Sequence, residues 1–158
     1  MTQLGVFRDD FYNPVNVLTN AQYNATAQAS GVLTAAVLAG AVENYILSSG
    51  ATALTTDTGA NIVANLQTCI IAQLKASGAL AAGSSGSPPA GVPNLTNLTF
   101  YVAIENTNGG TLTLTAGTGV TFVGAATIAT VTTRSFLVTV TSPTTVSFQT
   151  LGAVATTA

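Results

Sequence analysis

Hydrophobic and polar residues alternate along most of the second half of the chain. The clearest example is "GTLTLTAGTGVTFVG", residues 110–124, in which Leu112 and Leu114 interleave with Thr111, Thr113 and Thr115. Alternation with a period of two predicts strands that bury one face. It predicts six short strands, at 97–105, 111–116, 119–123, 126–130, 133–141 and 144–150. The turn signals "NTNGG" and "SP" between them favour a small antiparallel β-sandwich, jelly-roll-like in its plan.

The inward positions of these strands supply a candidate core. It consists of Phe100, Leu112, Leu114, Val120, Phe122, Ile128, Phe136, Val138, Val140, Val146 and Phe148.

One segment carries the helical period instead. In residues 57–76, Val63, Leu66, Ile70 and Leu74 follow the spacing of a single buried helix face. Asp57 or Thr58 is placed to act as the N-cap of this helix. Upstream, "LTAAVLAG" can form a helical turn, and β-branched and aromatic residues at 41–48 predict a strand.

These elements indicate a mainly β protein with a helical segment, an α+β fold in four parts. Residues 1–30 are polar with scattered apolar anchors and predict an extended N-terminal arm. Residues 31–80 hold the strand and the helix. Residues 81–93 form a linker rich in Gly, Ser and Pro, and residues 94–158 form the C-terminal β-sandwich domain.

Charged residues are scarce, and their scarcity indicates how the protein exists in solution. Only 5% of the 158 residues are charged, with a formal net charge of −2, against roughly 25% in ordinary soluble proteins. Such a chain favours a permanent assembly that covers part of its surface. Three cations do not suffice for nucleic-acid binding or for an anionic membrane surface, so we expect neither partner. The first residues carry no secretory signal pattern, which indicates synthesis and folding in a cytoplasm.

Catalytic chemistry finds little support in the sequence. There is no histidine and a single cysteine, so we expect no metal site, no cofactor and no enzymatic activity. The glycines of "AGTGVTFVG" lack the lysine and the following helix of a phosphate loop, and a turn between strands explains them better. An enzyme such as a polysaccharide depolymerase would need paired acids among Glu43, Asp57 and Glu105.

The pattern of residues 54–152 adds a resemblance. "LTTDTGANIVANLQ", a linker, and then "LTFYVAIENTNGGTLTLTAGTGVTFVGAATIATVTTRSFLVTVTSPTTVSFQTLG" resemble the decoration proteins of tailed bacteriophages, also called cement or head-fibre proteins. The resemblance implies a structural virion protein on the capsid exterior, made in the host cytoplasm. It implies a homotrimer that binds the major capsid protein and reinforces contacts between its subunits. A phage fibre or receptor-binding recognition module is the alternative.

Five residues are candidates for the interface. Phe7, Phe11 and Tyr12 are apolar anchors of the arm, which lies either on its own domain or on a neighbouring subunit. Thr113 represents a strand face of bare threonine, which meets another protein or forms a neutral exterior.

Arg134 is the fifth candidate and the only cation of the β-region. It is solvated, pairs with Glu105 in its own chain, or crosses to Asp9, Asp10 or Glu43 of another subunit.

Overall fold

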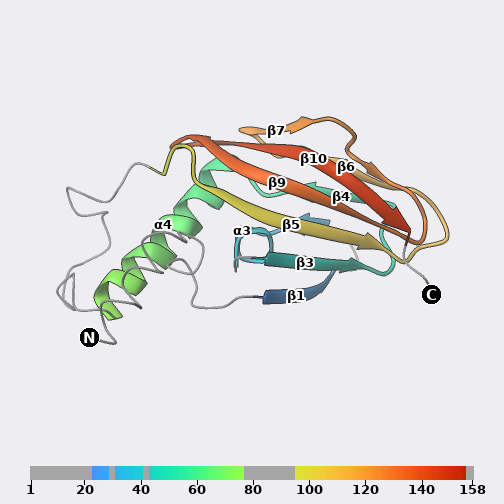
Figure 1. Ribbon diagram of the computed structural model, residues 1–158, viewed down its shortest axis with the longest axis horizontal. Coiled ribbons are helices and arrows are strands. Elements are labelled where there is room, and N and C mark those ends of the chain that lie inside the picture. The colour runs from blue at the N-terminus through green and yellow to red at the C-terminus, as the bar shows by residue number, and fades with distance from the viewer. Residues whose placement is uncertain (1–22, 29–30, 41–42, 77–94, 156–158) are drawn as a thin grey trace.

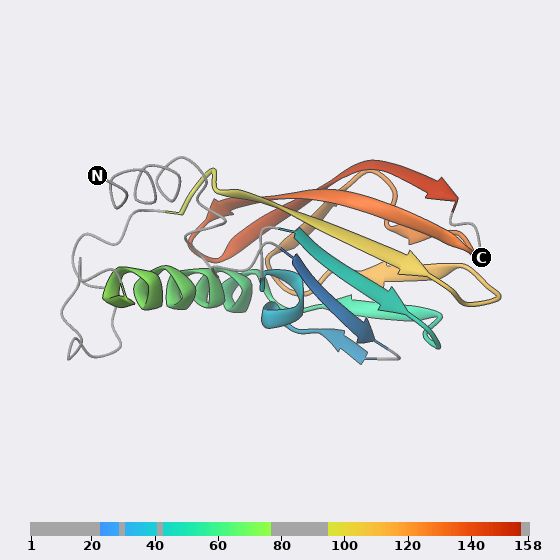
Figure 2. The ribbon, with the colours of Figure 1, turned by 60° about the horizontal axis from the view of Figure 1, so that its bottom comes forward.

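The computed structural model describes residues 23–28, 31–40, 43–76 and 95–155. Two β-sheets face each other across one core, and a long helix lies at one end of the sandwich (Figures 1 and 2). The predicted α+β class, mainly β with a helical segment, is confirmed.

Sheet A has six strands and sheet B has four. In spatial order, sheet A comprises β1 (Tyr23–Gln28), β3 (Glu43–Ser48), β5 (Thr99–Asn106), β9 (Thr132–Ser142), β10 (Thr145–Ala155) and β7 (Val120–Val123). Sheet B comprises β2 (Gly31–Leu33), β4 (Ala53–Thr56), β6 (Leu112–Thr115) and β8 (Thr127–Ile128). All six strands predicted in the second half are present, as is the strand predicted at 41–48.

The first eight strands alternate between the two sheets, so the chain winds around the core. β1, β3 and β5 are consecutive neighbours in sheet A, and both of these pairs are parallel. β2, β4 and β6 are related in the same way in sheet B. A strand that follows one full circuit runs in the same direction as the strand it lands beside, which explains the parallel pairing.

This winding differs from the sandwich expected from sequence. Only β5–β9, β9–β10 and β6–β8 are antiparallel, and β7 pairs with β10 in parallel. The expected self-contained domain at 94–158 is also not how the sheets are built. β5 pairs with β3, and β6 pairs with β4, so strands from both sides of residues 81–93 share both sheets.

The expected arm at 1–30 needs correction at its end. Residues 23–28 form β1, which pairs with β3 along its whole length. Residues 1–22 and the linker at 81–93 lie outside the described residues.

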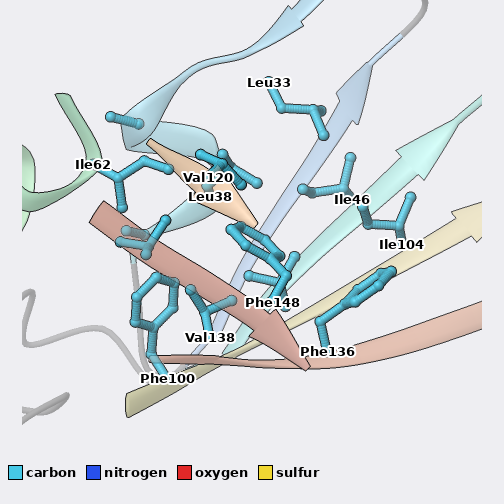
Figure 3. Packing of buried hydrophobic residues seen from close by; sticks show 14 of the residues in the cluster. Leu33, Leu38, Ile46, Ile62, Phe100, Ile104, Val120, Phe136, Val138 and Phe148 are labelled. Atoms are coloured by element: carbon cyan, nitrogen blue, oxygen red, sulfur yellow. The ribbon is translucent and has the colours of Figure 1, made fainter. Parts of the chain in front are cut away.

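The core is apolar and built mainly from the positions that alternation predicted. Every residue of the candidate core is buried except Phe122, which is partly buried and packs against the rest. Phe122, Phe136 and Phe148 form a cluster with ring centroids 5.3–6.1 Å apart in tilted or edge-on arrangements, as favourable aromatic pairs prefer. Figure 3 shows Phe136 and Phe148 close to Ile46 and Ile104 from the opposite half of the sheet.

Helix α4 (Gly59–Ala76) closes one end of this core, and the short helix α3 (Ala35–Leu38) packs beside it. The predicted face of α4 is confirmed for Val63, Leu66 and Ile70, which are all buried, and Ile62 joins them. The predicted cap is also present: the Thr58 hydroxyl accepts the Asn61 N–H at 3.2 Å, which satisfies one donor of the first turn.

Asp57 connects both helices and the neighbouring strand. Its Oδ2 accepts the first N–H of α3, from Ala35, at 3.0 Å, and its Oδ1 accepts the Thr58 N–H and the Asn61 amide at 2.8 and 2.7 Å. Its own N–H donates to the Leu33 carbonyl of β2. Burial acts to raise the pKa of Asp57, but the hydrogen bonds from Asn61, Thr58 and Ala35 together hold that pKa below its ordinary value.

Candidate functional site: two exposed sheet faces

The outer face of sheet B carries small neutral side chains and is called the threonine face here. It consists of Val32, Ala53, Thr55, Thr113, Thr115 and Thr127. The strand register aligns these residues in two rows, one running from Ala53 through Thr113 to Thr127 and the other from Val32 through Thr55 to Thr115. None of these six residues is charged.

Thr113 points outward at the centre of this face, as alternation predicted. Leu112 and Leu114 on either side of it are buried, whereas Thr113 is exposed. Its backbone N–H donates to the Thr52 carbonyl at 2.9 Å. Its exposed side chain is neutral, as are the other five side chains of this face.

The outer face of sheet A is chemically different and is called the tyrosine face here. It includes Tyr45, Leu47, Tyr101, Ala103, Leu137 and Val154, together with the acids Glu43 and Glu105. Tyr101 is 50% exposed and Val154 is 73% exposed. Register aligns Glu43 with Tyr101 and Leu137 in one row, and Leu47 with Glu105, Thr133 and Val154 in another.

The tyrosine face was not among the surfaces that the sequence predicted. A signal was present in "TFYVAIE". Phe100, Val102 and Ile104 take the buried positions of β5, so the period of two leaves Tyr101 on the outside. Large exposed apolar side chains on one surface mark interaction sites more often than isolated ones do.

Arg134 lies on the opposite face of sheet A from the tyrosine face. It follows the same period as Phe136 and Val138, which are buried, and it pairs in register with Ile104 on β5. Glu105 is the next residue of β5 and points outward. The predicted ion pair between Arg134 and Glu105 within one chain is therefore wrong, because the two side chains leave opposite faces of the sheet.

The remaining predicted residues are not brought together by the described structure. Phe7, Phe11 and Tyr12 lie outside the described residues. Of the acids considered for catalysis, Asp57 is engaged at the start of α4, whereas Glu43 and Glu105 share the tyrosine face. Glu43 pairs with Tyr101, four residues before Glu105 on β5, which corresponds to a separation of about 13 Å along the strands.

Residues 116–119, which include Gly117 and Gly119, form the turn between β6 and β7. The backbone of this turn contacts the start of α4. The Gly59 N–H donates to the Thr118 carbonyl at 2.8 Å, and the Val146 N–H donates to the Gly119 carbonyl at 2.9 Å. A Cβ on Gly117 would lie 2.5 Å from the carbonyl oxygens of Thr56 and Asp57. Glycine is required here because three backbone segments touch.

Other kinds of site find no support in the described part of the chain. No three His, Cys, Asp or Glu side chains gather there as a metal would require. No helix among these residues is both long and apolar enough to cross a bilayer.

Comparisons with known proteins identify no relative of this chain. No family model, no curated protein and no solved structure matches the chain.

Proposed function

We propose that this protein is a structural component of a phage virion, a decoration or cement protein. It assembles as a homotrimer, binds the major capsid protein on the capsid exterior and reinforces contacts between capsid subunits. The resemblance of residues 54–152 to such proteins supports the proposal. The threonine face supports it independently, since none of its six residues is charged.

The threonine face is the strongest structural support for the proposal. A solvent-facing sheet normally includes charged residues, which keep it soluble and discourage association. The six residues of this face include none, yet threonine retains a high preference for strands. A neutral β-surface can be covered by another protein without the desolvation cost of burying a charge. We therefore assign the threonine face to protein–protein contact.

Electron microscopy of virions from cultures that produce the protein tests the assignment. An antibody against the protein should label the capsid at many copies per particle. Capsids that lack the protein should disrupt at a lower temperature than capsids that carry it. Labelling of a few copies at the tail would instead support the fibre or receptor-binding alternative. Labelling of neither structure would overturn the virion assignment altogether.

The arm is tested separately by a truncated protein. Removal of residues 1–20, which include Phe7, Phe11 and Tyr12, should reduce binding to undecorated capsids if the arm contributes to capsid contact. The truncated protein keeps every described strand, the first of which begins at Tyr23, and a thermal melt checks that it folds. Undiminished capsid binding by the truncated protein would place the contact elsewhere.

A further inference from the structure

The tyrosine face exposes large apolar side chains to solvent. Six such side chains are exposed in the described part of the chain, and three of them lie on this side of sheet A: Tyr101, Val123 and Val154. Val123 shares this side because it pairs with exposed Gln149, and Val154 because it pairs with outward-facing Thr133. Exposed apolar side chains that share one surface mark contact sites for other proteins.

Acids and tyrosines alternate on two neighbouring strands of this face. Glu43 and Tyr45 lie on β3, and Tyr101 and Glu105 lie on β5 beside it (Figure 1). Glu43 pairs with Tyr101, which places their backbones about 5 Å apart. Tyr45 pairs with Ala103. Each of its diagonal neighbours, Tyr101 and Glu105, therefore lies about 8 Å away.

Both carboxylates lack a partner in the described structure. Neither Glu43 nor Glu105 accepts a hydrogen bond or forms an ion pair there, and no described lysine or arginine lies on this face. Lysine and arginine bind carboxylates through charge-assisted hydrogen bonds, and both are attracted to the faces of aromatic rings. The tyrosine face is therefore complementary to a surface that carries cations among apolar side chains.

The described residues of a second copy of this chain offer no such surface. The chain has three cations, Arg8, Lys75 and Arg134, and Arg8 lies outside the described residues. Lys75 is in the last turn of α4, whereas Arg134 is near the start of β9. Figure 2 shows α4 and the start of β9 at opposite ends of the sandwich. The acids of the tyrosine face also disfavour nucleic acid and anionic lipid, because like charges repel.

We propose that the tyrosine face binds the major capsid protein, at a surface of that protein where lysine or arginine side chains lie among apolar ones. Tyr101 provides the apolar anchor of the contact, and Glu43 and Glu105 pair with the cations. Tyrosine on one partner and arginine on the other are the residues that most often dominate binding energy at interfaces. The inference rests on the proposed function, and it leaves the threonine face for contacts between copies of this chain.

The test is binding of the purified full-length chain to undecorated capsids, measured by co-sedimentation at low and high salt. Y101S should weaken binding about 30-fold, as the loss of a central interface tyrosine does. E43Q/E105Q should weaken binding roughly tenfold at low salt, because each variant carboxamide loses its attraction to a cation. That difference should shrink at about 1 M NaCl, where charges are screened beyond about 3 Å.

Two matched controls separate the face from general effects. Val131 is 41% exposed but lies in the turn before β9, on neither sheet face, so V131S should bind capsids as the unmodified chain does. E43D/E105D keeps both charges and should bind within about threefold of the unmodified chain. Each variant should melt within about 3 °C of the unmodified chain, as exposed substitutions do, and native mass spectrometry should give it the same oligomeric mass.

Three results would overturn the inference alone. They are capsid binding that survives in both Y101S and E43Q/E105Q, binding by the unmodified chain that salt does not weaken, and binding that is lost in T113K but not in Y101S. The last result would assign the capsid contact to the threonine face. An unmodified chain that does not bind capsids at all would overturn the proposed function, and this inference with it.

Discussion

Gly59 offers the sharpest test of how the fold is held together, because two effects of opposite sign act on its replacement by alanine. Gly59 opens helix α4, where alanine is intrinsically better than glycine by up to about 1 kcal/mol. The structure predicts the reverse. A Cβ at this position would lie 2.5 Å from the carbonyl oxygens of both Gly119 and Thr144.

The expected cost follows from these contacts. Each is about 0.9 Å shorter than the 3.4 Å at which ordinary contact begins, and both oxygens belong to backbone that cannot rotate away. Overpacking costs typically 1–3 kcal/mol. Moving the turn would also strain the hydrogen bonds from Gly59 to Thr118 and from Val146 to Gly119, at about 1 kcal/mol each. We expect Gly59→Ala to lower the free energy of unfolding by roughly 2–4 kcal/mol.

Urea denaturation and thermal unfolding measure this change. The melting temperature should fall by roughly 5–15 °C in a chain of this size. Gly109→Ala is the matched control, since nothing lies within 4 Å of its added Cβ, and it should be neutral or stabilising by less than about 1 kcal/mol. A Gly59→Ala protein as stable as the unmodified chain would refute the close approach of α4 to the two turns.

Three further predictions concern single side chains. Asp57→Asn should be less stable than the unmodified chain at pH 7. Because hydrogen bonding lowers the pKa of Asp57 in the folded state, that difference should shrink as the pH falls below about 3.8, which denaturation at pH 7 and pH 3 will show. Asn106→Leu should cost about 1–3 kcal/mol in a thermal melt, since the carbonyl of Ile128 loses its donor. Thr113→Lys should leave the monomer's stability within about 0.5 kcal/mol but reduce trimer mass in light scattering. The same substitution at exposed Thr121, on sheet A, should not.

Local sequence patterns predicted the elements well where one periodicity dominated. The helix at 57–76 and the strands of the second half have long runs of regular spacing. Their buried positions are confirmed where the structure describes the side chains, which leaves out Leu74, and Phe122 is only partly buried. β2 and β4 were missed, because three or four residues such as "ALTT" cannot show a period. Tyr23–Gln28 was read as arm, because polar "YNATAQ" forms a strand only where β3 supplies a partner.

The pairing of strands was beyond local patterns. Period-two alternation states which side chains are buried but not whether a neighbouring strand runs parallel or antiparallel. The parallel pairs β1–β3 and β3–β5 arise from winding around the core, which is a property of the whole chain.

The positions of some candidate surface residues could likewise be predicted from local alternation. Thr113 was placed outward by its neighbouring leucines, and the alternation of "TRSFLVTV" already sets Arg134 on the side of Phe136 and opposite Glu105.

The winding path has a consequence for how the chain can be divided. A cut within residues 81–93 would separate β1 to β4 and both helices from β5 to β10, and each piece would hold an incomplete half of both sheets. Neither piece could close the core by itself, since β3 needs β5 and β4 needs β6. The two fragments should therefore be largely unfolded apart and recover strand structure when mixed, as the halves of a split reporter do. Circular dichroism of the separate and the mixed fragments would then measure their association directly, as a gain in strand content on mixing.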